Sequence, residues 1–389
     1  MGKELCFDIT VIVYLTKQQD LQGIVKMVDE GMKGYLKGKD YRIIMVNASG
    51  ELLDIKCNKV FKVYNISRSI VDMFLFKLIK DIASMDMKSI VVINGDNKEV
   101  NEDLVGGLAS PTLMHDYVAP MYYNMNPLYN LAYSLITYPV TVMLYGLNIT
   151  CTHPLDFGLG KKMIEIIKEN DYDQIVPCNF SIGSLLNLIA LVNGLEVVVA
   201  HVPPHELDYE QYYGSDQDLF IKELIPLLNI MEEYELSWLR IKPQLSYPAE
   251  AYVAKRFEVK GLIPHIDAIT LLQKAKVDLN KYIPIYSEIL KEKASEVLRQ
   301  LHVNDPKDLD INDDLWSYIV IRYLTSMLKE PKITNRIEMI KGLVNLTLVK
   351  ASQIAYELEK AESVKERMIK LAEKFLRHRD EFIKLLEVG

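Results

Sequence analysis

The chain has 389 residues, of which 49% are hydrophobic and 25% are charged, a composition typical of globular proteins. This composition excludes collagenous, disordered and disulfide-scaffold classes. The formal net charge of −8 disfavours a general nucleic-acid binder, which usually carries a basic excess. The four cysteines are far apart and form no zinc-type or disulfide framework, and the first residues contain no apolar signal core. We therefore expect a cytoplasmic protein in a reducing compartment.

The N-terminal part of the chain alternates between apolar, β-branched runs and helical periodicity. Strands are predicted at residues 8–15, 41–46, 60–64, 89–93, 117–120, 156–159 and 195–202, with helices at 20–36 and 69–85. Continuous apolar strands separated by helices predict an α/β fold with a mostly parallel sheet that is covered on both faces. Ligands of such sheets bind beyond the carboxyl ends of the strands, which directs attention to residues 15–17, 47–51 and 94–97.

After about residue 213 the pattern becomes helical. Helical segments, with breaks at prolines and polar turns, are predicted at residues 219–234, 266–272, 285–301, 315–329 and 334–386. We expect two domains, an α/β domain over residues 1–213 and a helical domain over residues 214–389. Residues 351–386 show one long amphipathic pattern, which predicts a helix packed on its own domain. The alternative is a dimerisation helix, so a homodimer is one expected assembly.

One segment has the length of a membrane span. Residues 131–150 contain no charged side chain over 20 positions, which is enough to cross a bilayer as a helix. The segment is rich in Tyr and Thr and contains Pro, whereas membrane helices are usually richer in Leu, Ile and Val. These features favour a buried helix over a membrane span, and we expect no membrane partner.

Two positions have the residue types of a metal site. Asp96 follows the apolar run SIVVIN, and a carboxylate at a strand end suits Mg²⁺ or Mn²⁺ bridging a diphosphate. His201 and His205 flank a Pro-Pro turn just after another predicted strand, where neutral imidazole would complete a metal site with Asp96. The alternative interpretations are an ordinary turn at Asp96 and solvated histidines.

Two further features concern the substrate side. Asp156-Phe157-Gly158 follows His153-Pro154-Leu155, and this turn would place one carboxylate in a cleft. It is not the kinase triplet, because no Gly-rich loop, HRD motif or strand Lys precedes it. Residues 99–160 contain no Lys or Arg but many Tyr. This stretch suits a neutral, hydroxyl-bearing or apolar ligand, and the alternative is an aromatic-rich core.

Several stretches in this order resemble those of the GT-A glycosyltransferases. The resemblance is greatest to the retaining branch that includes glucosyl-3-phosphoglycerate synthase and its glucosylglycerate and mannosylglycerate relatives. It rests on the runs DITVIVYLTKQQDLQGIVKMVDEGMKGYL, YRIIMVNASG, SIVVINGD, HDYVAPMYY, YPVTVMLYG with PLDFGLG, and DLFIKELIPLLNIMEEYELSW. The run YPVTVMLYG followed by PLDFGLG is the most specific match. The likeness covers roughly the first 240 residues.

The chain also departs from the family pattern. The Asn and Glu that follow the family's first strand are absent from VYLTK, and the Asp of the second-strand loop is Asn47. The first Asp of the DxD motif is Asn94, whereas its last Asp is kept as Asp96. The Gly-Lys-Gly loop appears as Asn65-Ile66-Ser67-Arg68, which keeps one basic group.

The resemblance implies a metal-dependent transferase that moves a sugar, with retention, from a nucleotide-diphosphate sugar to a small, glycerate-like hydroxyl acceptor. It implies a metal, Mg²⁺ or Mn²⁺, held by Asp96 and His201, with His205 as the alternate. It places Asp156 at the sugar and acceptor side, and Arg68 is the candidate basic group for the leaving diphosphate. The expected donor-site residues are Leu15, Asn47, Ser49, Asn94 and Asp96.

The lost family residues indicate a second hypothesis, in which a catalytically degenerate transferase-like protein acts as a binding or regulatory subunit. A third is a membrane-associated transferase with a lipid-linked acceptor, which rests on residues 131–150 alone.

Overall fold

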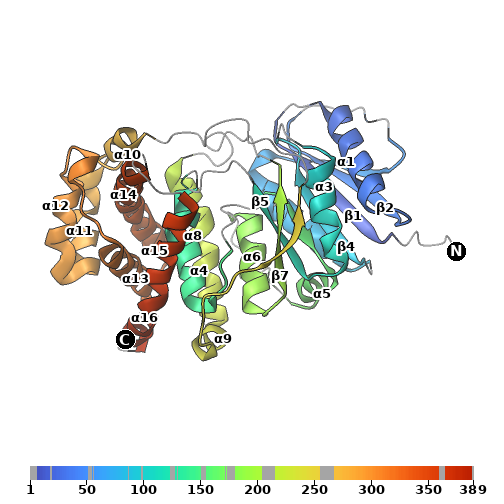
Figure 1. The fold of residues 1–389 in the computed structure, drawn as a ribbon. Coiled ribbons are helices and arrows are strands. Elements are labelled where there is room, and N and C mark those ends of the chain that lie inside the picture. Colours follow the sequence, from blue (N-terminus) through green and yellow to red (C-terminus); the bar gives the residue numbers. More distant parts are fainter. Residues whose placement is uncertain are drawn as a thin grey trace. The chain divides into compact units, whose positions relative to one another are not determined.

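The computed structural model describes residues 7–17, 20–50, 55, 57–85, 87–97, 100–122, 128, 130–149, 155–170, 172, 180–203, 215–254, 267–358 and 364–387. The chain divides into two compact units, which are coloured along the sequence in Figure 1. The sheet unit comprises Met1–Met125, His153–Asp208 and Pro248–Leu262. The helical unit comprises Asn126–Thr152, Tyr209–Tyr247 and Ile263–Gly389. The expected boundary between residues 213 and 214 stays a prediction. These units differ from it in three segments, since residues 126–152 and 209–213 belong to the helical unit and residues 248–262 to the sheet unit.

The sheet unit is built on eight hydrogen-bonded strands in the order β3-β2-β1-β4-β6-β5-β7-β8. Their bounds are β1 Ile9–Leu15, β2 Tyr41–Asn47, β3 Val60–Asn65, β4 Ser89–Asn94, β5 Tyr117–Tyr122, β6 Phe157–Leu159, β7 Val197–Val202 and β8 Ala249–Val253. Only β6 runs antiparallel to its neighbours, β4 and β5, while the other pairs are parallel. The predicted α/β fold with a mostly parallel sheet is confirmed.

The register brings the carboxyl ends of four strands to one edge. Leu15 pairs with Asn47 between β1 and β2, and Asn47 pairs with Asn65 between β2 and β3. On the other side of β1, Tyr14 pairs with Asn94 of β4. Every residue of β1, β2 and β4 is buried, as expected for β-branched runs that are covered on both faces.

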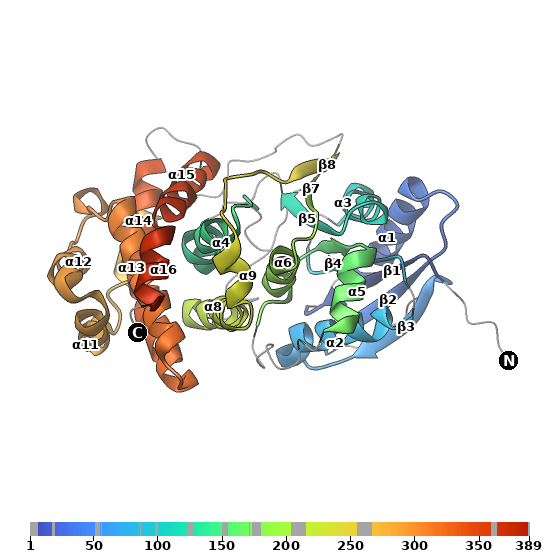
Figure 2. The ribbon, with the colours of Figure 1, turned by 90° about the horizontal axis from the view of Figure 1, so that it is seen from below.

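Helices cover both faces of this sheet. The helices of the unit are α1 Leu21–Tyr35, α2 Val71–Ala83, α3 Glu102–Ala109, α5 Lys161–Glu169 and α6 Ile182–Val192. Figure 2 shows α1 and α3 on one side of the sheet and α2 and α5 on the other. Alternate residues of β1, such as Ile9, Val11 and Val13, form one apolar cluster with Val25 and Val28 of α1 and with α3. The helices at 20–36 and 69–85 are confirmed, whereas the sequence did not single out α3, α5 and α6.

The edge strand β8 was not predicted, because AEAYV carries no continuous apolar run. Its Tyr252 is anchored on α1 and α3, where its hydroxyl lies 3.0 Å from Asp103 Oδ1 and 2.9 Å from Tyr35 Oη. A Cβ at Gly107 would lie 2.6 Å from the Tyr252 ring, and one at Gly106 would lie 2.1 Å from the Tyr35 ring. The two glycines of α3 therefore let both rings pack closely against this helix.

The helical unit buries both tryptophans of the chain, Trp238 and Trp316. Its elements are the π-helical turn η4 Tyr133–Thr137, α4 Tyr138–Tyr145, α8 Asp216–Glu233, α9 Glu235–Arg240, α10 Ala268–Lys274, α11 Leu279–Leu290, α12 Ala294–Leu301, α13 Asp313–Lys329, α14 Ile333–Leu358, α15 Val364–Arg377 and α16 Arg379–Glu387. The indole N–H of Trp316 donates to Leu135 O at 3.0 Å, which joins α13 to η4. A helical C-terminal region is confirmed.

Two helix predictions were wrong in length. The pattern at 351–386 is not one helix, because it runs from the end of α14 through α15 and α16. At His378, between α15 and α16, the ring nitrogens contact Asp314 and Glu381. The pattern at 285–301 is likewise interrupted between α11 and α12, where Lys291 has φ of +48°. Tertiary contacts and backbone turns thus interrupt a continuous amphipathic pattern.

The uncharged segment 131–150 contains η4 and α4, and α4 ends at Gly146 with φ of +77°. All residues of both elements are buried except Tyr145, which is half-buried. Tyr133 and Tyr138 stack with ring centroids 6.4 Å apart, and their hydroxyls donate to Ile149 O and Asn148 Oδ1. The segment is therefore a buried core helix, and no helix among the described residues has the length and apolar character needed to cross a bilayer.

Candidate functional site

The polar segments that follow β1, β2, β3 and β4 lie at one edge of the sheet, because these four strands are parallel and in register. Antiparallel β6 begins at the same edge, which brings Asp156 beside the end of β4. Residues far apart in the sequence thus form one polar region at the place where parallel α/β sheets bind ligands. We call this region the carboxyl edge. It holds Leu15, Asn47, Ser49, Asn94, Asp96 and Asp156.

Asp96 joins the ends of β4 and β1 through neutral donors. Its carboxylate is 4% exposed and accepts from Thr16 N–H at 2.9 and 3.0 Å, from Thr16 Oγ1 at 2.6 Å and from Lys17 N–H at 3.0 Å. Three donor groups, the Thr16 N–H, the Thr16 hydroxyl and the Lys17 N–H, thus engage both carboxylate oxygens. Asp96 therefore fixes the loop after β1 in this structure.

Asp156 and Asn94 fix the end of β4. The fully buried Asp156 accepts from Asn94 N–H at 2.5 Å, and Asn94 Oδ1 accepts from Asp96 N–H at 3.0 Å. Tyr14 Oη donates to Leu155 O at 3.1 Å and ties β1 to the residue before Asp156. Within the described residues Asn94 Nδ2 is buried and has no hydrogen-bond partner. A buried amide without a partner is a free donor beside the two carboxylates.

A second polar group lies at the ends of β2 and β3. Asn47 is 2% exposed, and its Oδ1 accepts from Ser49 N–H at 3.1 Å and Ser49 Oγ at 2.7 Å. Asn47 Nδ2 donates to Asn65 Oδ1 at 2.7 Å, and the Asn65 side chain is exposed. The side chains of Asn47, Ser49 and Asn65 are themselves neutral, whereas the group at β1 and β4 contains two carboxylates.

His201 lies near the end of β7, three strands away from β4 in the sheet order. Its Nε2 is 3.0 Å from Glu250 Oε1 of β8. His205 lies outside the described residues. The described residues contain no group of three or more His, Cys, Asp or Glu that could hold a metal ion.

Two of the expected metal ligands, Asp96 and His201, are engaged by neighbouring groups of the chain in this structure. Asp96 would have to exchange hydrogen bonds to Thr16 and Lys17 for the ion, and His201 already contacts Glu250 through one ring nitrogen. The expectation of Mg²⁺ or Mn²⁺ at Asp96, His201 and His205 stays a prediction.

Other residues near the carboxyl edge differ in which of their groups a ligand could contact. The Leu15 side chain belongs to the apolar cluster beneath the sheet, so only its backbone is available at the edge. Arg68 is exposed in the 3-10 turn Arg68–Ile70, just after β3. Lys17 is half-buried, and its ammonium forms no hydrogen bond or ion pair within the described part of the chain. Such an ammonium group is available for an anion.

Sequence reasoning missed the residues that fix the site, namely Thr16, Asn65 and Glu250. Their importance comes from contacts over long sequence separations, such as the 80 residues between Thr16 and Asp96. The one available signal was position, because Thr16 and Asn65 follow or end predicted strands. Glu250 had no such signal, since β8 was not predicted.

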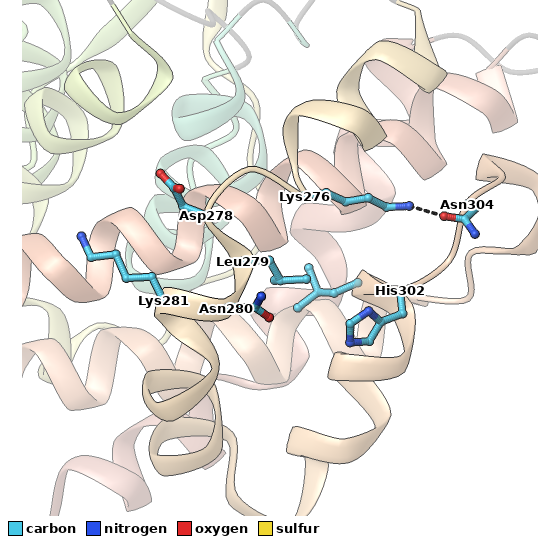
Figure 3. A pocket seen from close by; sticks show the side chains of 8 residues that line it. Lys276, Asp278, Leu279, Asn280, Lys281, His302 and Asn304 are labelled. Atoms are coloured by element: carbon cyan, nitrogen blue, oxygen red, sulfur yellow. Dashed lines mark hydrogen bonds between the residues drawn. The ribbon is translucent and has the colours of Figure 1, made fainter.

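A groove of about 570 Å³ lies in the helical unit, at the start of α11 and the end of α12 (Figure 3). Lys276 Nζ donates to Asn304 Oδ1 at 2.6 Å across one side of it. Lys281 points away from the groove and pairs with Glu338 at 3.0 Å. Because both lysines have partners, this groove lacks the uncommitted cations of an anion site.

No protein-family model matches the sequence, and no curated protein matches it. Solved structures do resemble the chain. Glucosyl-3-phosphoglycerate synthase from Mycobacterium tuberculosis, in complex with phosphoglyceric acid, is 12% identical over 58% of this chain and 80% of its own, with a TM-score of 0.37. The same enzyme in complex with Mn²⁺, UDP and phosphoglyceric acid is 12% identical over 59% of this chain and 78% of its own, with a TM-score of 0.37.

A mannosyltransferase from Pyrobaculum calidifontis, in complex with GDP-Man and Mn²⁺, is 9% identical over 98% of this chain and 86% of its own, with a TM-score of 0.30. The sequence motifs indicated the group that contains the first of these enzymes. At such identities and TM-scores the likeness carries no argument about function, which must come from the site itself.

Proposed function

We propose that the chain is a glycosyltransferase that moves a sugar from a nucleotide-diphosphate sugar to a small, glycerate-like hydroxyl acceptor with retention. The observation that carries this proposal is the carboxyl edge, where the loops after β1, β2, β3 and β4 meet Asp156. Four of the runs that resemble the retaining GT-A group, those that contain β1, β2, β4 and Asp156, border these loops. A nucleotide site at this edge follows the general rule for parallel α/β sheets.

The proposal assigns a role to each side of this edge. The neutral group at β2 and β3, with Asn47 and Ser49, would bind the nucleoside. Arg68 would lie near the diphosphate, because a guanidinium can donate two parallel hydrogen bonds to phosphate oxygens. Asp156 would lie at the sugar and acceptor side, where it also holds the end of β4. Charge stabilisation by one such group is worth about 3–4 kcal/mol in the transition state.

The proposed reaction includes a divalent metal ion. Mg²⁺ or Mn²⁺, when bound, would supply positive charge to the leaving diphosphate. Among the described residues, Arg68 and Lys17 are cations near this edge, and both can contribute to the same task. A homodimer and a cytoplasmic location remain part of the expected picture.

The second candidate function is a catalytically degenerate protein that uses this fold as a binding or regulatory subunit. One observation favours it: the carboxylates of Asp96 and Asp156 are bonded to backbone N–H groups of this chain. Carboxylates that are already satisfied in this way stabilise loops without requiring any ligand.

Calorimetric titration separates the two functions. UDP-glucose, GDP-mannose and GDP-glucose are each titrated with Mg²⁺, with Mn²⁺ and with a chelator. The transferase proposal predicts that at least one donor binds and that Arg68→Ala weakens its binding. Exposed Arg299 of α12 offers a matched control, and Arg299→Ala is expected to leave binding unchanged. Absence of binding of every donor to folded protein would contradict the transferase and favour the second function.

A further inference from the structure

Two asparagines at the ends of neighbouring strands form a chain of hydrogen bonds with a fixed direction. The chain begins at the backbone N–H of Ser49, which lies 3.1 Å from Asn47 Oδ1. A backbone N–H can only donate, so the atom that faces it must be the amide oxygen of Asn47. The Ser49 hydroxyl, at 2.7 Å from the same oxygen, adds a second donor. The orientation of the Asn47 amide is therefore determined by the backbone.

The orientation of Asn47 determines that of Asn65. The Asn47 amide nitrogen is the only polar side-chain atom of Asn47 left to face Asn65, and it donates to Asn65 Oδ1 at 2.7 Å. Asn47 and Asn65 are direct partners in the parallel register of β2 and β3, which holds the two side chains together. The Asn65 oxygen is thus occupied, and its NH₂ group is the part that faces outward from an exposed side chain.

The resulting feature is a neutral hydrogen-bond donor at a defined place on the carboxyl edge. It carries no positive charge that would favour a phosphate, and a ribose hydroxyl can both donate and accept, so a ribose would not require a donor. A nucleobase is different, because bases present either a ring carbonyl or an amino group at matching positions. A fixed donor discriminates between these two groups.

We propose that Asn65 determines base specificity by donating its amide hydrogen to a ring carbonyl of the nucleotide. This inference rests on the proposed function. The site should accept bases with a carbonyl at the reading position, as in uracil or hypoxanthine, and reject those with an amino group there, as in cytosine or adenine. An amino group would face the Asn65 NH₂ with two donors and no acceptor, which leaves both unpaired.

The test uses pairs of nucleotides in which one member has a ring carbonyl where the other has an amino group. The two members also differ in the proton on the neighbouring ring nitrogen. UDP and CDP form the pyrimidine pair, and IDP and ADP form the purine pair. In the wild-type protein, the carbonyl member of at least one pair is expected to bind about tenfold more tightly. Direct titration by calorimetry gives this ratio without any requirement for catalysis.

Asn65→Asp is the decisive variant, because it turns the outward donor into an acceptor. Asn47 Nδ2 can still donate to one Asp oxygen, so the neighbouring geometry is kept. The added negative charge repels both members of a pair equally. The ratio of their affinities therefore measures only the discrimination between the carbonyl and the amino group of the base. We expect the ratio to move toward the amino member by about tenfold or more, and Asn65→Leu to bring it close to equality.

Asn280→Asp is the matched control, because it makes the same chemical change at an exposed position in the helical unit. It is expected to leave the ratio unchanged. Equal wild-type affinity for both members of both pairs would overturn the proposal, as would a ratio that Asn65→Asp does not change. In either case the nucleotides still bind and the proposed function survives. Failure of all four nucleotides and of all three sugar donors to bind would instead contradict the proposed function itself.

Discussion

Two aspartates, a buried one in the sheet unit and a half-buried one in the helical unit, accept hydrogen bonds from different kinds of donor. Asp96 in the sheet unit is held by neutral donors, the N–H groups of Thr16 and Lys17 and the Thr16 hydroxyl. Asp313 in the helical unit is held by cations: Arg367 donates two bonds at 2.7 Å, and the fully buried Lys350 donates one at 2.9 Å.

The two aspartates differ in how easily their hydrogen-bond donors can be replaced by a ligand or by water. Neutral donors can return to water or turn to a ligand at modest cost, whereas a buried cation that loses its partner is left uncompensated. The network of Asp313 therefore fixes α13, α14 and α15 to one another as a permanent part of the fold. At the carboxyl edge, in contrast, a ligand can displace the neutral donors that bind the Asp96 carboxylate.

The largest effect is expected from Asp313→Ala. The variant leaves Lys350 and Arg367 without their shared partner in a buried place, so we expect the helical unit to lose about 3–5 kcal/mol of stability. Urea unfolding followed by tryptophan fluorescence measures this directly, because both tryptophans, Trp238 and Trp316, lie in the helical unit.

Asp314→Ala is the matched control, since Asp314 is the next residue on α13 but its side chain is 59% exposed in its pairs with Lys374 and His378. Exposed ion pairs contribute about 0–1 kcal/mol, so its loss should be small. Similar losses of stability for the two variants would show that the Asp313 network stabilises the helical unit no more than an exposed ion pair does.

The next largest effect is expected from Asp96→Ala. It frees the N–H groups of Thr16 and Lys17, which lie at the sheet edge where water can reach them after rearrangement. We expect a loss of about 1–3 kcal/mol in the sheet unit, smaller than that for Asp313. Hydrogen exchange of the β1 and β4 amides measures it, because this unit contains no tryptophan. A loss as large as that for Asp313→Ala would contradict the contrast between the two sites.

The smallest effect is expected in the pH dependence of stability. Burial opposes ionisation of Asp313, but Arg367 and Lys350 outweigh it and hold the pKa of Asp313 below its ordinary value of 3.8. Because the folded pKa is depressed, this stability is present above pH 3.8 and is lost as the pH falls through the folded pKa. One proton changes the free energy of unfolding by at most about 1.4 kcal/mol per pH unit.

We therefore expect the tryptophan-monitored stability of the helical unit to fall more steeply below pH 3.8 in the wild type than in Asp313→Asn. Burial also lowers the pKa of Lys350, and the Asp313 charge counteracts this lowering. Equal slopes in the two proteins would show that Asp313 does not titrate with folding.

Much of the fold could be predicted from the sequence, because β1 and β4 are uninterrupted β-branched runs and α1 and α2 show clear helical spacing. Prediction failed where tertiary contacts decide the structure. β8 forms because Tyr252 packs on Gly107, and the helical pattern near the C-terminus is interrupted at His378. Neither contact leaves a local signal in the sequence.

For the site, the positions could be predicted but not the partners. Strand ends located Asn47, Asn94 and Asp96 correctly at one edge, because parallel strands share their carboxyl side. That Asp96 accepts hydrogen bonds from Thr16 and Lys17 depends on loop geometry across 80 residues, which no local pattern reveals. The assignment of Asp96 as a metal ligand stays a prediction.

The central claim is that a nucleotide binds at the carboxyl edge of the sheet. Hydrogen–deuterium exchange of the full chain, with and without UDP or GDP at saturating concentration, tests it most directly. The account predicts that protection increases in the segments around Thr16, Asn47–Ser49, Asn65 and Asn94–Asp96, while α10 to α16 of the helical unit stay unchanged. Protection confined to the groove between α11 and α12, or none for nucleotides at saturating concentration, would contradict it.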